Sequence, residues 1–378
     1  HIFKAIVYAG ISSLFLPALW YIAAWKQGGD DFLDVVLAEN FGRFFNTSTP
    51  DIDYRLGHEN GFYYNFVTLI AGFLPWTILF FFSLFGLKVR KPEKTVKELV
   101  TGIWTSIKSM EKVRLFSLVV IVCVIFFYSF PASKRSVYLM PAYPFIALFL
   151  AQYAIYITEY KTKATRVFAA FLASCTSLVL IASALVMGGA INLSTIVAQY
   201  TDKASTLYTV SLIQNSLANP TFLTVFLFVL LLIALGILLY QMFRKINIKI
   251  LYATIGLAFA LNLVTDGVFM YTIREGSSCK AFATRIKKEY PVNRSNVFVV
   301  NNLLKYKNMY GLNFYMGNLF HDFEKQLPEE GYFLVCENNM PDIEKEYKDQ
   351  YSFTFLTATE NIPDELDQKI LLYSFTKK

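Results

Sequence analysis

Apolar and polar residues alternate along this chain in long blocks. Seven apolar blocks approach or exceed the roughly 17 to 25 residues that a helix needs to cross a hydrocarbon core. Polar connections separate the blocks, so the pattern predicts a polytopic bundle of transmembrane helices, mainly α, over residues 1–273. The predicted spans are Ile6 to Trp25, Phe62 to Leu87, Leu115 to Phe130, Leu139 to Ile157, Val167 to Met187, Thr221 to Phe243 and Ile250 to Tyr271.

The composition supports this interpretation. Hydrophobic residues make up 55% of the chain, and its 36 Phe and 24 Tyr exceed the needs of a soluble protein. The mean hydropathy is +0.42. The formal charge of +7 comes without a module of basic and aromatic residues for nucleic acid, so we expect no nucleic-acid partner.

The basic residues of the connections predict the orientation. One side carries fourteen and the other six, and the richer side of a membrane protein is normally cytoplasmic. Residues 26–61, the loop at Lys134 and the tail after Ile273 are therefore expected outside the plasma (inner) membrane. The fourteen are Lys88, Arg90, Lys91, Lys94, Lys97, Lys108, Lys112, Arg114, Lys161, Lys163, Arg166, Arg244, Lys245 and Lys249. The six are Lys26, Arg43, Arg55, Lys134, Arg135 and Lys203.

The outward loop 26–61 contains a second helical pattern. From Asp30 to Phe45, apolar residues recur at roughly helical intervals with charged residues between them. This predicts a helix lying in the membrane interface. It either serves only as an amphipathic anchor or belongs to a functional site, and the spacing favours neither.

Residues 274–378 predict a small α/β domain outside the membrane. Strands are expected at Asn296 to Val300, Gly331 to Val335, Tyr351 to Thr357 and Lys369 to Phe375, with a helix at Pro341 to Tyr347. The segment has no phosphate-binding glycine loop, so we expect it to cover or support the membrane part. Cys279 and Cys336 both lie there, and a disulfide between them is left open.

Ionisable residues near the membrane are candidates for function. Lys134, Arg135 and Tyr138 fall in a short connection between two predicted spans, and cations at that depth favour an anionic partner such as a lipid phosphate. The other interpretation is a plain helix start with Lys134 reaching the lipid headgroups. Asp266, near the outer end of the last span, is expected to be solvated.

Four groups of residues, taken in order, resemble the membrane glycosyltransferases of the bacterial aminoarabinose transferase type, relatives of the dolichyl-phosphate-mannose protein mannosyltransferases within the GT-C class. They are Glu39-Asn40-Phe41-Gly42-Arg43-Phe44, then His58 with Phe62-Tyr63-Tyr64, then Gly72-Phe73-Leu74-Pro75-Trp76, then Ser133-Lys134-Arg135 with Tyr138-Leu139-Met140-Pro141 and Tyr143-Pro144.

The resemblance implies a cavity open to the outside and a lipid-phosphate site at Lys134 or Arg135 and Tyr138, to which we add Arg43. It also implies a zinc ligand at His58; from the residues alone, His58 is either an interfacial histidine held by hydrogen bonds or a ligand of a metal or phosphate. The chain begins at His1, so we expect further spans upstream. The resemblance implies that these spans carry the general base and the acidic partner of His58.

Within the chain, the weaker candidates for the general base are Asp30, Asp31, Asp34 and Glu39. The predicted function is transfer of a sugar from a polyprenyl-phosphate donor to a lipid, glycan or protein acceptor. The alternative is a transporter or flippase for an anionic lipid-linked substrate, without chemistry. The resemblance leaves the donor sugar and the acceptor open.

Overall fold

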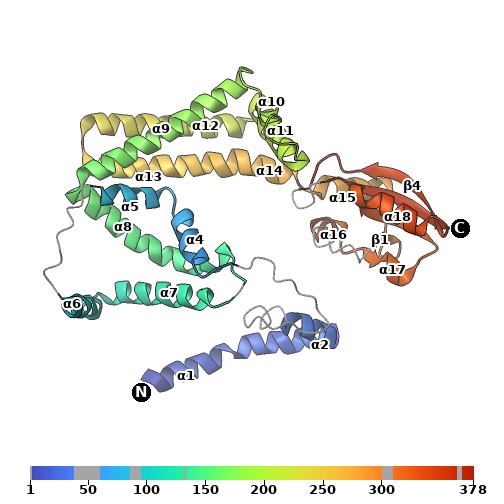
Figure 1. Cartoon of the computed structure of the whole chain (residues 1–378), viewed down its shortest axis with the longest axis horizontal. Helices are drawn as coiled ribbons and strands as arrows, with labels where there is room; N and C mark the ends of the chain where they lie inside the picture. Colours follow the sequence, from blue (N-terminus) through green and yellow to red (C-terminus); the bar gives the residue numbers. More distant parts are fainter. Residues whose placement is uncertain (1, 38–59, 86–94, 132, 300–309, 364–367) are drawn as a thin grey trace. The chain divides into compact units, whose positions relative to one another are not determined.

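The computed structural model describes residues 2–37, 60–85, 95–131, 133–299, 310–363 and 368–378 (Figure 1). The chain forms two compact units, His1–Phe168 and Ala169–Lys378. The sequence-based boundary after residue 273 remains a prediction.

All seven predicted spans have helical counterparts. Six helices are long and apolar enough to cross a membrane, and a bent pair of shorter helices provides a seventh candidate, counted over the described residues. The pair is α4 (Tyr64–Gly72) and α5 (Trp76–Leu84), with a bend of 101° between them. The protein is therefore a multi-pass membrane protein, mainly α, as the sequence predicts.

The first unit consists of helices and their connections. α6 is amphipathic and begins with a capping box, in which Thr95 and Glu98 satisfy each other's backbone N–H groups. Besides α4 and α5, the described elements are α1 (Ile2–Ser13), α2 (Phe15–Leu37), α6 (Val96–Lys108), α7 (Lys112–Ser129), the 3-10 helix η2 (Ser136–Ala142), α8 (Tyr143–Tyr160) and the start of α9 (Thr162–Met187).

The predicted interfacial helix falls partly within the described residues. Gly29 interrupts α2 with a φ of 73°, a backbone conformation that glycine adopts without a Cβ penalty. Helical structure resumes at Asp30, the expected first residue, and continues to Leu37. Residues 38–45 of the predicted helix lie outside the described part of the chain.

In the second unit, α12 (Phe222–Arg244) and α13 (Asn247–Val264) pack along their length (Figure 1). Leu231 and Leu238 of α12 are completely buried, as are Ile250 and Leu257 of α13. The helical run continues from α13 into the π-helix η3 (Thr265–Met270), α14 (Tyr271–Gly276) and α15 (Lys280–Glu289). α10 (Leu193–Val197) and α11 (Ala204–Ala218) precede α12.

The C-terminal part contains a mixed five-stranded sheet of order β2-β1-β3-β5-β4 in the described residues. β1 pairs in parallel with β2 and β3, whereas β5 pairs antiparallel with β3 and β4. A register shift interrupts β4 between Phe355 and Thr357. The strands are β1 (Val297–Val299), β2 (Phe320–Asp322), β3 (Glu330–Cys336), β4 (Tyr351–Ala358) and β5 (Ile370–Lys377).

The four predicted strands correspond to β1, β3, β4 and β5, and the predicted helix to α18 (Met340–Tyr347). The sequence analysis missed β2 and the helices α15, α16 (Tyr310–Met316) and α17 (Phe323–Gln326). β2, α16 and α17 have seven residues or fewer, too short to show a clear apolar period.

Two apolar clusters stabilise the sheet. One contains Cys279 and Cys336, which are both buried. The other is aromatic: the ring of Phe323 contacts the rings of Phe333, Tyr351 and Phe375 at centroid distances of 5.0 to 5.2 Å. Such edge and tilted arrangements add to the free energy gained from burial.

We expect Tyr351→Phe to leave the stability unchanged or to raise it by up to about 2 kcal/mol. Tyr351 is 2% exposed, and its buried hydroxyl has no hydrogen-bonding partner in the described part of the chain. Removing an unsatisfied hydroxyl while keeping the ring removes a desolvation cost. The stability is measured as the temperature at which the tail unfolds in the full protein, detected by limited proteolysis. Tyr351→Leu, which is expected to destabilise the domain, is the contrasting variant. A clear loss of stability in Tyr351→Phe would contradict the prediction.

The same variant should reduce the sensitivity of the domain to alkali. Burial raises the pKa of Tyr351. The unfolded chain releases this proton near pH 10, whereas the folded chain retains it, so stability falls as the pH rises above about 10. Tyr351→Phe lacks this contribution.

Candidate functional site

The connection between α7 and α8 holds the residues predicted to bind a lipid phosphate. We call residues 131–142 the hairpin. Its second half is η2, which contacts α4, α7 and α8. Leu139 and Ala142 are fully buried and anchor η2 to these helices. The hairpin is therefore fixed to its surroundings by an apolar core.

Lys134 is buried within the hairpin, at 5% exposure. Its ammonium Nζ donates to the carbonyl oxygens of Asn60, at 3.0 Å, and Pro131, at 2.6 Å. Asn60 Nδ2 donates in turn to the Lys134 carbonyl at 3.2 Å. Pro131 follows the end of α7, where helix carbonyls favour a cation. Lys134 thus connects the segment before α4 to the hairpin.

Arg135 differs from Lys134 because its side chain is exposed. The guanidinium has no hydrogen bond or ion pair to any described residue. The Arg135 carbonyl accepts from the backbone N–H of Tyr138 at 3.1 Å, which begins η2. The planar guanidinium of Arg135 can bind two neighbouring oxygens of one ligand, such as those of a phosphate.

Tyr138 is one turn along η2 from Arg135 and half-buried. Its ring stacks on Tyr128 of α7, with centroids 5.2 Å apart and an interplanar angle of 22°. The hydroxyl forms no hydrogen bond within the described ranges. The stack fixes the ring and leaves the phenol O–H free to donate.

The bend between α4 and α5 packs on the other end of η2. Tyr143 lies 4.9 Å from Phe73 between ring centroids. A Cβ added at Gly72 would lie 2.6 Å from the Tyr143 hydroxyl, so this position requires the small residue. The Leu74–Pro75 peptide is cis. The Gly72-Phe73-Leu74-Pro75 motif therefore has a packing role next to the hairpin.

Two asparagines that the sequence analysis did not select hold the hairpin region together. Besides Asn60, Asn65 of α4 is 1% exposed and donates from Nδ2 to the Tyr128 carbonyl at 2.9 Å and to Ser129 Oγ at 3.2 Å. An amide inside an apolar span is the signal that could have identified Asn65, since polar groups there have partners.

The other predicted site residues are not assembled by the described structure. Arg43, Glu39 and His58 lie outside the described residues, and Asp31 and Asp34 are placed only by their backbone in α2. Asp30 is exposed and accepts from Trp25 Nε1 at 2.8 Å. Asp266 is exposed within η3, and its solvation by water remains a prediction.

Nothing in the described residues assembles a zinc site. No three His, Cys, Asp or Glu side chains gather there in a metal-binding group. A zinc ion at His58 would therefore need ligands from the segments around it or from outside this chain segment.

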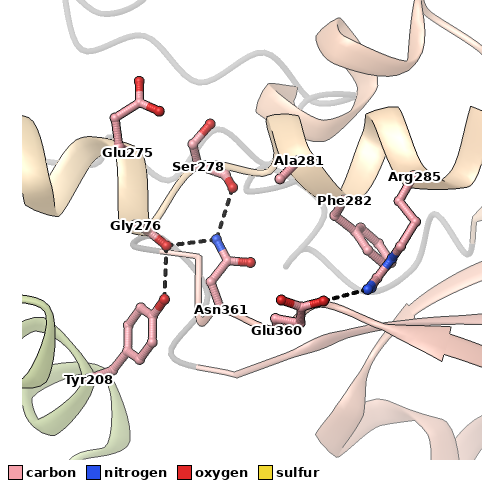
Figure 2. A pocket seen from close by; sticks show the side chains of 9 residues that line it. All are labelled: Tyr208, Glu275, Gly276, Ser278, Ala281, Phe282, Arg285, Glu360 and Asn361. Atoms are coloured by element: carbon pink, nitrogen blue, oxygen red, sulfur yellow. Dashed lines mark hydrogen bonds and ion pairs between the residues drawn. The ribbon is translucent and has the colours of Figure 1, made fainter.

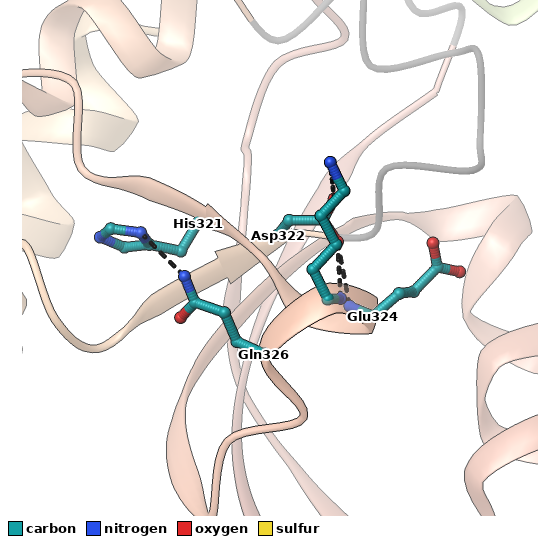
Figure 3. A network of polar contacts seen from close by, with 5 residues as sticks. His321, Asp322, Glu324 and Gln326 are labelled. Carbon is teal, nitrogen blue, oxygen red and sulfur yellow. Dashed lines mark hydrogen bonds and ion pairs between the residues drawn. The ribbon is translucent and has the colours of Figure 1, made fainter.

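His321 has structural neighbours in the C-terminal domain (Figure 3). Its Nε2 contacts the Arg294 carbonyl and therefore carries the proton, while Nδ1 lies 3.5 Å from Gln326 Nε2. The adjacent Asp322 caps α17 by accepting from the backbone N–H groups of Glu324 and Lys325. These contacts support β2 and α17.

The bundle of apolar helices and the C-terminal sheet domain form a fold that has a counterpart among solved structures. The fold is similar to the crystal structure of ArnT from Cupriavidus metallidurans bound to undecaprenyl phosphate, with a TM-score of 0.54 and 12% identity over 96% of this chain. An uncharacterized protein of Aquifex aeolicus (strain VF5) is 26% identical over 147 residues, 39% of this chain. No family model matches the chain.

The chain spans only part of each relative. It covers 59% of the ArnT chain and 24% of the Aquifex protein. The likeness to ArnT, at this level of identity, shows the fold alone.

Proposed function

We propose that this chain is part of a membrane glycosyltransferase that moves a sugar from a polyprenyl-phosphate donor to an acceptor at the outer face of the plasma membrane. The observation that supports it best is the presence in one short hairpin of an exposed guanidinium at Arg135, which has no partner among the described residues, and of the Tyr138 phenol, whose ring is fixed on Tyr128. The bound undecaprenyl phosphate of the ArnT structure is consistent with a polyprenyl carrier.

The reaction requires an anion site of this kind. The acceptor hydroxyl oxygen attacks the anomeric carbon of the sugar, and the bond from that carbon to the phosphate oxygen breaks. The bonding electrons leave with the polyprenyl phosphate, whose charge grows in the transition state. Arg135 would supply positive charge and Tyr138 a hydrogen bond at that oxygen.

A carboxylate must take the proton of the acceptor hydroxyl. The resemblance assigns this base to a segment upstream of the chain. Asp30, Asp31, Asp34 and Glu39 are the remaining candidates, and Asp30 already accepts a hydrogen bond from Trp25. Arg43 and the zinc ligand His58 remain hypotheses, and no step above depends on them.

The competing function is a transporter or flippase that binds the same anionic lipid without chemistry. An assay of the full-length protein in lipid nanodiscs distinguishes the transferase from the transporter. The protein is supplied with undecaprenyl-phosphate sugars and with a crude fraction of lipid, glycan and protein acceptors. Release of undecaprenyl phosphate with labelled sugar on the acceptor supports the transferase. Lipid movement in proteoliposomes without any sugar transfer would replace it with the transporter.

We expect residues 89–113 to be cytoplasmic and residues 280–378 to be outside, because fourteen basic residues against six favour this orientation. A membrane-impermeant maleimide applied to intact cells should modify Thr284→Cys and not Lys97→Cys, since both positions are exposed in the fold. The parent protein, with its own cysteines, is the background control. Labelling of Lys97→Cys together with protection of Thr284→Cys would contradict the predicted orientation and indicate the opposite one.

A further inference from the structure

A polar pocket of 360 Å³ lies in the second unit, between α11, the α14–α15 junction and the segment after β4 (Figure 2). Its volume is within the range of about 300 to 1,000 Å³ that is typical of small-molecule sites. The polar side chains that line it are Tyr208, Glu275, Ser278, Arg285, Glu360 and Asn361.

Hydrogen bonds to the end of α14 fix one wall of this pocket. The Gly276 carbonyl accepts from Tyr208 Oη at 3.0 Å and from Asn361 Nδ2 at 2.9 Å. Asn361 Nδ2 also donates to the Ser278 carbonyl at 2.9 Å. The two hydrogen bonds that Nδ2 donates therefore fix the orientation of the Asn361 amide, and its oxygen Oδ1 can accept a hydrogen bond from a ligand (Figure 2).

An ion pair forms the opposite wall. Arg285 donates from Nη1 to Glu360 Oε1 at 2.6 Å and from Nη2 to the Ala358 carbonyl at 2.6 Å. Its guanidinium also lies over the Phe282 ring, 5.6 Å from the centroid. Each terminal nitrogen of Arg285 thus donates one hydrogen bond, and the second oxygen of Glu360 has no partner in the described part of the chain.

Most of the polar side-chain groups left for a ligand are hydrogen-bond acceptors. They are Asn361 Oδ1, the second oxygen of Glu360 and the carboxylate of Glu275, none of which has a partner in the described part of the chain. The Ser278 hydroxyl accepts from the Lys280 N–H and keeps its own O–H to donate. A ligand that fits them must present several donors at fixed spacing. The hydroxyl groups of a sugar ring meet this requirement without bringing a charge.

We infer that the pocket binds a neutral saccharide, whose hydroxyl groups donate to Glu275, Glu360 and Asn361. The inference rests on the proposed function in one respect: it assigns this saccharide to the glycan part of the acceptor. Binding itself depends only on the pocket.

Saturation-transfer NMR on the full-length protein in nanodiscs tests the inference, with the methyl glycosides of glucose, galactose, mannose and N-acetylglucosamine as probes. At least one glycoside should bind. Ala281→Trp, at an exposed position of α15 that lines the pocket, should abolish its signal. Thr284→Trp, exposed on the same helix outside the lining, should leave it unchanged.

A second variant tests the role of the Glu275 carboxylate without filling the pocket as Ala281→Trp does. Glu275→Gln keeps the shape and removes the charged acceptor, so binding should weaken about tenfold, as for loss of a hydrogen bond to a charged group. Glu289→Gln, an exposed carboxylate of α15 that does not line the pocket, is the matched control.

Three results would overturn the inference: no glycoside binds, binding survives both Ala281→Trp and Glu275→Gln, or glucosamine binds where the methyl glycosides do not, which would indicate an amine site. Sugar transfer is measured separately. Glycoside binding that Ala281→Trp abolishes, in a protein without transfer, would preserve the saccharide pocket and reject the proposed function.

Discussion

Arg135→Met and Tyr138→Phe are each expected to lower sugar transfer about 10²- to 10³-fold, the usual loss when one preorganised donor to a developing anion is removed. Neither should change the melting temperature, because Arg135 is exposed and Tyr138→Phe keeps the ring on Tyr128. Transfer from an undecaprenyl-phosphate donor by the full-length protein is the measurement.

Tyr143→Phe is the control for the phenol. It removes a hydroxyl from the same region while keeping the ring on Phe73, and transfer should remain within a few-fold of the parent rate. Near-normal transfer in both Arg135→Met and Tyr138→Phe would return the hairpin to an ordinary interfacial turn.

Lys134→Met is expected to act mainly on stability. It removes the donor from two carbonyl oxygens in a buried place, and each carbonyl left without a partner costs about 1 to 3 kcal/mol. The melting temperature in detergent should therefore fall by several degrees, and transfer should fall only as far as folded protein is lost.

Arg135→Met is the matched control, since it also replaces a basic residue with methionine, at the adjacent position. The contrary result is a Lys134→Met protein with an unchanged melting temperature and a transfer rate reduced as much as in Arg135→Met. Lys134 would then be a phosphate ligand after all.

The sequence was sufficient to predict the membrane spans because the bilayer imposes a single length and polarity on each of them. It also predicted β1, β3, β4 and β5, whose apolar runs are buried in the sheet. β2 was missed because three residues carry no periodic signal. The bend between α4 and α5 was hidden within one apolar block from Phe62 to Leu87, since Pro75 marks a break but not an angle of 101°.

The hairpin shows what spacing cannot decide. Lys134 and Arg135 are adjacent and both basic, so the sequence treats them as equivalent. In the fold one is enclosed by the Asn60 and Pro131 carbonyls and the other is exposed. Which of them turns inward depends on Asn60, 74 residues earlier in the chain, and no local pattern contains that contact.

The two edge strands of the C-terminal sheet affect the tendency of this domain to aggregate. An open edge strand is a template for pairing with another molecule, and proteins protect such edges with short strands or bulges. β2 offers only three residues, and the register shift between Phe355 and Thr357 interrupts β4. Among the described strands, neither edge presents a long regular ladder, an arrangement that disfavours strand-to-strand aggregation even though Phe355 is exposed at the β4 edge.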